Sequence, residues 1–303
     1  MRDSYGRPVT GLRISVTNAC DLDCFYCHGE GCQGGSREMT SEEIGNLVRF
    51  GSELGIKKVK LTGGEPLVRG DIEEIVSEVA QPSIVDVSMT TNGTQLTRKA
   101  EALGEAGLDR INVSLDSLDP QIYARIAGKS KLNQVLDGID AALDADLWPV
   151  KLNMIILNGV NDDEVDRMIE YSLEKEVILQ LIELLWTPET AEIYERYHRE
   201  LSFIEQGLEK RASKVRTRWA MQARRKYVLD GGGEVEVVNP MHNSEFCNHC
   251  TRLRTTPDGY LKPCLMRNDN LVDFLTPLRS GDKDGVYKAF KEAIARREPY
   301  HRT

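Results

Sequence analysis

Residues 20–28 read CDLDCFYCH and contain Cys20, Cys24 and Cys27, three of the seven cysteines in this 303-residue chain. Thiols this close together are typical of metal ligands or reactive groups in a reducing compartment, and not of a disulfide framework. The residues leave three interpretations open. They are a closed zinc site with His28 as fourth ligand, covalent haem attachment through CFYCH, and an iron–sulfur cluster held by three thiolates.

The composition narrows the class of protein. A net charge of −9, with 40% hydrophobic and 29% charged residues, is the balance of a soluble globular chain. The negative charge argues against general binding to nucleic acid or to anionic membranes. The N-terminal segment has no signal-peptide core, and no stretch is long and apolar enough to span a membrane. We therefore expect a cytoplasmic protein, and covalent haem attachment, which follows export, is disfavoured.

Short β-branched segments alternate with amphipathic ones over the first part of the chain. Segments 41–55 and 162–176 have apolar residues at helical spacing, with Ser41, Asp162 and Asp163 as N-terminal capping signals. This alternation predicts an α/β fold with a parallel sheet of six βα units, curled into a partial TIM-like barrel. The carboxyl ends of such strands form the active-site face, so the residues that follow them should converge. The predicted strands are 12–17, 59–63, 85–93, 110–116, 150–157 and 179–184.

The alternation stops near residue 186, which suggests two parts, a barrel at 1–189 and a smaller C-terminal extension at 190–303. Residues 190–227 are charged and are predicted to be mostly helical, and DGGG at 230–233 predicts a turn beside the strand-like EVEVV. The basic run KRASKVRTRWAMQARRK, 210–226, could line a phosphate channel. A solvent-exposed helix face is the favoured interpretation.

The spacing C-x3-C-x2-C, followed by GGEP after the next predicted strand, resembles the radical S-adenosylmethionine (SAM) superfamily. The resemblance implies a partial βα barrel with a 4Fe–4S cluster on Cys20, Cys24 and Cys27. The iron without a protein ligand would bind SAM, and reductive cleavage of SAM would give a 5'-deoxyadenosyl radical. The resemblance also implies a set of contacts to SAM: Tyr26, Gly63, Gly64, Glu65, Pro66, Ser114 and Leu185.

A second group of cysteines lies in the C-terminal extension. Cys247, Cys250 and Cys264 could hold zinc with His249 or His242 as fourth ligand, or a second cluster. Arg252 and Arg254 follow two residues apart, so in an extended segment both side chains point to the same side. Paired guanidiniums suit an anionic or carbonyl-rich substrate.

Several motifs in order, LRISVTNAC, KLTGGEPL, TTNG, NVSLD, VKLN with GVND, and FCNHCTRLR, resemble the GTP 3',8-cyclase family in its archaeal form. This is the molybdenum cofactor biosynthesis protein A family. The resemblance implies a lyase that converts GTP to (8S)-3',8-cyclo-7,8-dihydroguanosine 5'-triphosphate, the first step of molybdenum cofactor biosynthesis. It implies a second 4Fe–4S cluster on the later cysteines, whose open iron binds the guanine of GTP.

Family membership would also fix partners and substrate contacts. The partners are an electron donor such as ferredoxin or flavodoxin, and cyclic pyranopterin monophosphate synthase as the downstream enzyme, and the chain could form a homodimer. The catalytic residues would be Cys20, Cys24, Cys27, Arg252 and Arg254. The contacts to GTP would be Arg13, Lys60, Thr91, Lys151, Arg252 and Arg254.

The chain departs from the family in two places. The family's Gly-Gly tail is replaced by REPYHRT, in which Arg297, Tyr300 or Arg302, or the preceding Arg296, could take its role, although a frayed terminus is favoured. Leu185 stands where many members have a methionine beside SAM. Cys32 has no partner at ligand spacing and is predicted to have no catalytic role.

Two alternative functions stay open. One is a radical SAM peptide-modifying enzyme with an auxiliary cluster, although such enzymes usually carry more cysteines in this region. The other is a binding protein in which zinc at both cysteine groups has a purely structural role.

Overall fold

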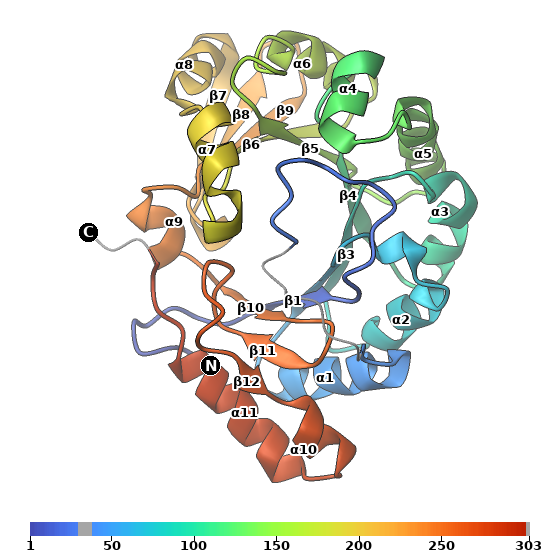
Figure 1. Ribbon diagram of the computed structural model, residues 1–303, viewed down its shortest axis with the longest axis vertical. Coiled ribbons are helices and arrows are strands. Elements are labelled where there is room, and N and C mark those ends of the chain that lie inside the picture. The colour runs from blue at the N-terminus through green and yellow to red at the C-terminus, as the bar shows by residue number, and fades with distance from the viewer. Residues whose placement is uncertain (30–37, 301–303) are drawn as a thin grey trace.

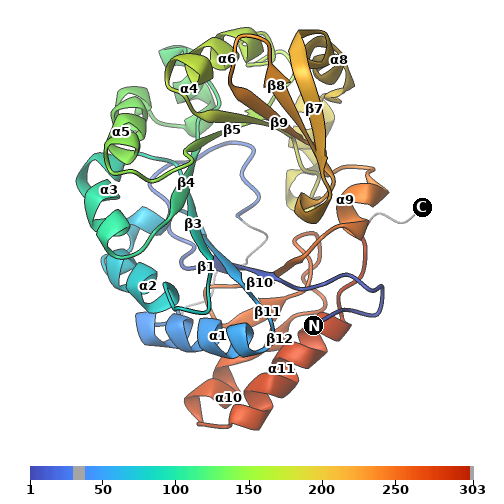
Figure 2. The ribbon, with the colours of Figure 1, turned by 180° about the vertical axis from the view of Figure 1, so that it is seen from behind.

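The computed structural model describes residues 1–29 and 38–300. Its first half consists of six parallel strands, each followed by one or more helices, as the sequence predicts (Figure 1). The helices cover the outside of the curved sheet and its concave side faces inward (Figures 1 and 2). The elements are β1 Gly11–Ser15, α1 Ser41–Glu53, β2 Lys58–Thr62, η2 Pro66–Val68, α2 Ile72–Val79, β3 Asp86–Thr91, α3 Leu96–Glu105, β4 Arg110–Ser114, α4 Pro120–Ala127, α5 Leu132–Asp144, β5 Lys151–Ile156, α6 Val165–Glu174 and β6 Ile178–Glu183.

The helix starts differ from the predicted capping residues. Thr40, and not Ser41, caps α1, because its hydroxyl accepts from the amide of Glu43 while the Glu43 carboxylate accepts from the amide of Thr40. Helix α6 begins later than predicted, after Glu164. Asp162 instead accepts from the amide of Gly159 in the preceding turn, so it stabilises the loop and not the helix.

The C-terminal part extends the same sheet at both ends. Strand β9 pairs in parallel with β6, and β10 pairs in parallel with β1. Within the described residues the strand order is β12-β11-β10-β1-β2-β3-β4-β5-β6-β9-β8-β7, so the barrel stays open between β12 and β7. The remaining elements are η3 Pro188–Thr190, α7 Ala191–Tyr197, α8 Ser202–Arg211, β7 Ala212–Arg218, η4 Trp219–Met221, β8 Arg224–Leu229, β9 Glu234–Val238, α9 Ser244–Asn248, β10 Arg252–Thr255, β11 Tyr260–Lys262, β12 Val272–Asp273, α10 Leu275–Arg279 and α11 Lys283–Ala295.

The prediction that 190–227 is mostly helical is confirmed by α7 and α8 and is wrong after residue 211. Most of the basic run 210–226 lies in the antiparallel hairpin of β7 and β8, in which Val215 pairs with Tyr227 and Arg218 with Arg224. In KVRTR, 214–218, a basic residue stands at every second position, and this period of two places the basic side chains on the opposite face of a strand from Val215 and Thr217. The turn predicted at 230–233 is present, because the amide of Leu229 donates to the carbonyl of Gly233 between β8 and β9.

Strand register puts two kinds of side chain on the two faces of the sheet. Leu12 and Ile14 of β1 are buried in the main hydrophobic core, whereas Arg13 between them lines the interior. Arg13 is in register with Lys60 of β2 on one side and with Arg254 of β10 on the other. The barrel therefore has an apolar outer layer under its helices and a strongly basic inner face. No helix in the described ranges has the length and apolarity needed to cross a membrane.

Candidate active site

Both cysteine groups line one cavity of about 360 Å³ inside the barrel. The first group lies on the loop after β1 and the second on the segments around β10 and β11, so more than two hundred residues separate them in sequence. None of the six cysteines described in these two groups forms a disulfide. Within residues 1–29 and 38–300, no three His, Cys, Asp or Glu side chains converge on a single-ion position. The cavity-lining cysteines are Cys20, Cys24, Cys27, Cys247, Cys250 and Cys264.

The first cysteine loop receives backbone hydrogen bonds that suit thiolates. The amide of Leu22 donates to Cys20 Sγ at 3.5 Å, and the amide of Gly29 donates to Cys27 Sγ at 3.4 Å. Burial raises the pKa of both Cys20 and Cys24, so without a metal these thiols hold their protons. Metal binding to such a site releases protons and stabilises the loop. The donors therefore fit an iron–sulfur cluster, which is held by thiolates.

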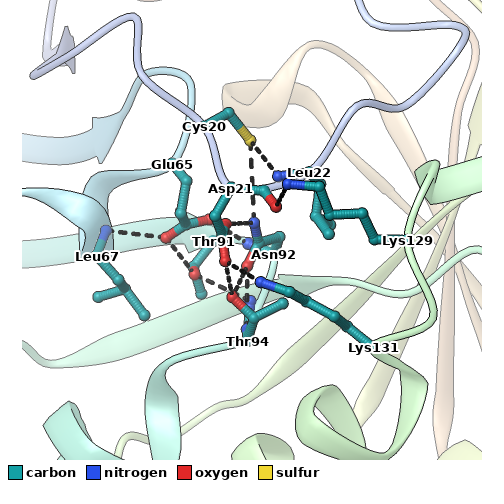
Figure 3. Close-up of polar contacts among 11 residues, drawn as sticks. Cys20, Asp21, Leu22, Glu65, Leu67, Thr91, Asn92, Thr94, Lys129 and Lys131 are labelled. Carbon is teal, nitrogen blue, oxygen red and sulfur yellow. Dashed lines mark hydrogen bonds and ion pairs between the residues drawn. The ribbon is translucent and has the colours of Figure 1, made fainter.

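Asp21 anchors this loop to the rest of the barrel (Figure 3). Its carboxylate accepts from Asn92 Nδ2 and Thr94 Oγ1, each at 2.7 Å, and from Lys131 Nζ at 2.8 Å. Lys129 Nζ donates to the carbonyl of Asp21 at 2.8 Å. Burial opposes ionisation of Asp21, but these donors outweigh it and lower its pKa. The carboxylate thus stays charged and holds the cysteine loop over the end of β3.

The GGEP segment packs directly against the start of the cysteine loop. A Cβ on Gly63 would lie 2.4 Å from the carbonyl oxygen of Thr17, and one on Gly64 would lie 2.2 Å from that of Ala19. Both glycines are therefore required by the fold as well as by any ligand that approaches them. Glycine at these positions brings the loop after β2 into contact with the loop after β1.

Glu65 is fully buried at the centre of a hydrogen-bond network (Figure 3). Its carboxylate accepts from Thr91 Oγ1 at 2.6 Å and from the backbone amides of Asn92 at 2.5 Å and Leu67 at 2.9 Å. Burial nevertheless raises its pKa to about 7. Pro66 begins η2 and is buried, and it is not among the residues that line the cavity.

Tyr26 connects the first cysteine loop to the segment after β4. Its hydroxyl donates to Asp116 Oδ2 at 2.5 Å, and Asp116 Oδ1 accepts from the amide of Ile155 at 2.8 Å. Burial raises the pKa of Asp116 to about 6. Ser114 and Leu185 also line the cavity, so six of the seven residues predicted to contact SAM face it.

The second cysteine group lies against a cluster of arginines. Cys247 belongs to α9, Cys250 precedes β10, and Cys264 follows β11. Burial opposes ionisation of the Cys250 thiol, but the positive charges of Arg297, Arg252 and Arg254 outweigh it and lower its pKa. A depressed thiol pKa favours the ligating thiolate form. Neither His242 nor His249 lines the cavity.

The six residues predicted to contact GTP all line the cavity, but two of them are engaged by buried acidic groups. Lys151 Nζ donates to Glu236 Oε1 at 2.9 Å, and Thr91 donates to Glu65. Lys60 Nζ donates to Asn112 Oδ1 at 2.8 Å, and burial together with the nearby charge of Arg110 lowers its pKa well below the usual value. The full set is Arg13, Lys60, Thr91, Lys151, Arg252 and Arg254.

The sequence interpretation missed Arg224 of β8. Its side chain lines the cavity, donates through Nη2 to Gln222 at 3.0 Å, and leaves a buried Nε without a partner. Burial lowers its pKa to about 10. The basic residues at every second position of KVRTR, 214–218, could have indicated a strand there, but RRKYVL at 224–229 has no such alternation and gives no local signal that Arg224 faces inward. Cys32 and Arg302 lie outside the described residues.

The fold and the two cysteine groups agree with matches to known proteins. Residues 14–172 match the radical SAM superfamily, and residues 177–303 match the family described as Molybdenum Cofactor Synthesis C. The solved structure of native anSMEcpe with bound AdoMet aligns with a TM-score of 0.63 and 15% identity over 93% of this chain and 81% of that one. SuiB of Streptococcus suis bound to S-adenosylmethionine gives a TM-score of 0.63 and 14% identity over 94% and 68%. At these identities the likeness concerns the fold alone, which is that of a radical SAM enzyme.

Sequence relatives are much more similar. A protein of Methanothermobacter thermautotrophicus named "Probable GTP 3',8-cyclase" is 50% identical over 302 residues, which is 99% of each chain. A protein of Pyrococcus horikoshii with the same name, "Probable GTP 3',8-cyclase", is 51% identical over 304 residues, which cover 98% of this chain and 97% of that relative. The chain belongs to the GTP 3',8-cyclase family.

Proposed function

We propose that this protein converts GTP to (8S)-3',8-cyclo-7,8-dihydroguanosine 5'-triphosphate, the first step of molybdenum cofactor biosynthesis. Its cofactors are SAM and two 4Fe–4S clusters. The observation that carries the proposal is the single cavity that receives both cysteine groups, with a basic surface between them. A reaction that brings a radical from one site to a nucleotide at the other needs this arrangement.

The first site holds and orients SAM. Cys20, Cys24 and Cys27 would ligate the first cluster, and when bound, that cluster and SAM supply a 5'-deoxyadenosyl radical. Asp21 fixes the cysteine loop through its four contacts, and Glu65 presents a buried carboxylate to the methionine end of SAM. The remaining contacts would come from Tyr26, Gly63, Gly64, Ser114 and Leu185, with Pro66 setting the shape of the loop.

The second site and the basic wall hold GTP. Cys247, Cys250 and Cys264 would ligate the second cluster, and Arg252 and Arg254 project from β10 beside them. Arg13 and Lys60 continue this basic row onto β1 and β2, because Arg13 is in register with Arg254 on one side and with Lys60 on the other. Arg224 adds a further guanidinium from the hairpin. Cations from several strands can neutralise a triphosphate inside a protein that is acidic overall.

The partners follow from the chemistry. Reductive cleavage of SAM needs a low-potential electron donor, for which ferredoxin or flavodoxin is suitable, and the cyclised product would pass to cyclic pyranopterin monophosphate synthase. Cysteines that are not in disulfides at both sites suit the reducing cytoplasm. A homodimer and a boundary between residues 189 and 190 are further parts of the proposal, which sedimentation and limited proteolysis would test.

The deciding experiment is anaerobic. Purified protein should contain about eight iron atoms per chain with matching sulfide, and one or two zinc ions without iron would remove the enzyme hypothesis. Incubation with SAM, dithionite and GTP should give 5'-deoxyadenosine and the cyclised nucleotide. Replacing Cys20, Cys24 or Cys27 with serine should abolish SAM cleavage. Normal 5'-deoxyadenosine formation by any of these variants would contradict the assignment of the first site.

A further inference from the structure

Three charged residues from the two ends of the chain meet beside the second cysteine group. Asp3 and Arg7 precede β1, and Arg297 follows α11. Arg7 Nε donates to Asp3 Oδ2 at 2.8 Å, and Arg297 Nη1 lies 3.0 Å from the same oxygen. Asp3 is 7%, Arg7 6% and Arg297 1% exposed. Arg297 is therefore a core residue, and the frayed terminus predicted from the sequence does not include it.

Both guanidiniums donate hydrogen bonds to the backbone of the second cysteine group. Arg7 Nη1 donates to the carbonyl oxygen of Cys247 at 2.9 Å, and Arg297 Nη2 donates to that of Cys250 at 2.5 Å. The amide of Cys250 also donates to the carbonyl of Cys247, so the C-x2-C segment is a tight turn held from outside by two arginines. A contact that served only to join the chain ends would not need to involve both ligand residues.

The charges of this group do not balance. Among the residues that the structure describes, one carboxylate and two guanidiniums in these ion pairs leave one positive charge uncompensated in a buried place. Burying an unpaired charge is unfavourable, so such an excess points to an anionic neighbour. Thiolates that hold an iron–sulfur cluster supply negative charge at that position.

We propose that Asp3, Arg7 and Arg297 are positioning residues that hold the Cys247–Cys250 turn in its ligating geometry, and that the net positive charge of the three raises the reduction potential of the second cluster. Hydrogen bonds and charge around a cluster both change its potential, and groups behind the ligands control metal affinity. The inference rests on the proposed function for the identity of the metal group, and it does not depend on GTP as the substrate.

The test uses the full-length chain in which Cys20, Cys24 and Cys27 are all replaced by serine, so that only the second cluster assembles. Arg297→Ala and Arg7→Ala should lose at least half of the remaining iron on anaerobic gel filtration. Arg297→Lys keeps the charge and should keep most of the iron. Asp3→Asn should retain iron but shift the potential to more positive values, as followed by electron paramagnetic resonance during a redox titration.

Arg296→Ala is the matched control, because Arg296 is the adjacent residue and its exposed side chain donates to Glu292 and to the carbonyl of Leu271. Iron retained at the parental level in both alanine variants, with an unchanged potential, would overturn the proposal. So would an equal loss of iron in Arg296→Ala. If the alanine variants do not fold, an unchanged potential in Asp3→Asn overturns it. Failure of the parent enzyme to cyclise GTP would contradict the proposed function and leave these measurements unaffected.

Discussion

Lys151 Nζ of β5 and Glu236 Oε1 of β9 lie 2.9 Å apart, and both side chains are almost completely buried. Glu236 also accepts hydrogen bonds from Gln180 and Arg218. Burial alone would raise its pKa, but the charges of Lys151 and Arg218 lower it to about 2. A residue expected to bind the nucleotide is thus paired with a carboxylate of the protein itself.

Glu236→Gln should therefore make the protein less stable and bind GTP more tightly. Removing one partner of a buried ion pair costs about 3 to 5 kcal/mol of unfolding free energy, because Lys151 and Arg218 lose their counter-charge. Anaerobic urea denaturation and equilibrium binding of GTP would measure the two effects. Glu234→Gln is the control on the same strand, since Glu234 forms a partly exposed pair with Lys226. Equal destabilisation by both changes would mean that the buried pair has no special role.

SAM binding should depend on pH through Glu65. Burial raises the pKa of this carboxyl to about 7, although Asn92, Thr91 and Leu67 donate to it. Glu65 is therefore mostly neutral below that pH and ionised above it, and only the ionised form can pair with the ammonium group of SAM. We expect the affinity to rise from about pH 6 to 8, with close to tenfold loss per unit below the pKa.

Equilibrium dialysis of SAM against anaerobic protein at several pH values would measure this affinity. The affinity of Glu65→Gln for SAM is expected not to change with pH in this range. A parental pH profile in Glu65→Gln would assign the titration to another group. The stability of the fold depends on the titration of Glu65 in the opposite direction to SAM binding. The carboxyl's contribution to stability is present below its ordinary pKa of 4.5 and is lost as the pH rises through about 7.

Arg252→Ala and Arg254→Ala should weaken GTP binding while both clusters still assemble. A hydrogen bond to a charged group is worth about 1.5 to 3 kcal/mol, which corresponds to roughly ten- to a hundredfold in affinity. Iron analysis beside a GTP binding isotherm separates the two effects. Parental turnover by both variants would show that these guanidiniums serve the structure and not the substrate.

Arg224→Gln tests the residue that sequence interpretation missed. Its unpartnered Nε suggests a phosphate contact, so we expect at least a tenfold loss of GTP affinity, on the order of one charge-assisted bond, and a smaller loss for Arg224→Lys. Binding of guanosine should change little. Arg225→Gln is the matched control, because the adjacent Arg225 pairs with Glu205 and Glu209 away from the cavity. An equal loss for guanosine and GTP would exclude a role at the phosphates.

Cys264→Ser should separate the two half-reactions. The variant should keep about four iron atoms and cleave SAM slowly with dithionite, yet form no cyclised nucleotide. A purely structural second site predicts misfolding and the loss of both activities. Thermal unfolding, 5'-deoxyadenosine and cyclised product are measured on one sample. Cyclisation at the parental rate by a folded variant would refute the substrate-binding role of the second site.

The sequence predicted the barrel well because its signals are local. All six predicted strands are present within two residues at each end, and GGEP follows β2 as expected. Cys20, Cys24 and Cys27 lie within eight positions, so their meeting required only one loop. The approach of both cysteine groups to one cavity depended on family resemblance, and the structure now explains it by the parallel pairing of β10 with β1.

What could not be predicted depends on contacts between distant segments. The local sequence does not distinguish the buried Arg297 from the exposed Arg296 beside it. Arg297 is buried where it meets Asp3, which comes from the other end of the chain. Arg224 and Arg225 are likewise adjacent and face opposite sides, a difference set by the register of β8 with β9. Partners such as Glu236, which engages Lys151, become visible only when the strands are in register.

The addition of C-terminal strands to both edges of the six-stranded barrel has a consequence for biosynthesis. When the ribosome has made the chain only through β6, β1 and β6 still have open edges, since β10 and β9 do not yet exist. Unpaired edges invite association with other chains. The nascent protein is therefore most vulnerable to aggregation late in translation, and it closes both edges only after the last third has emerged.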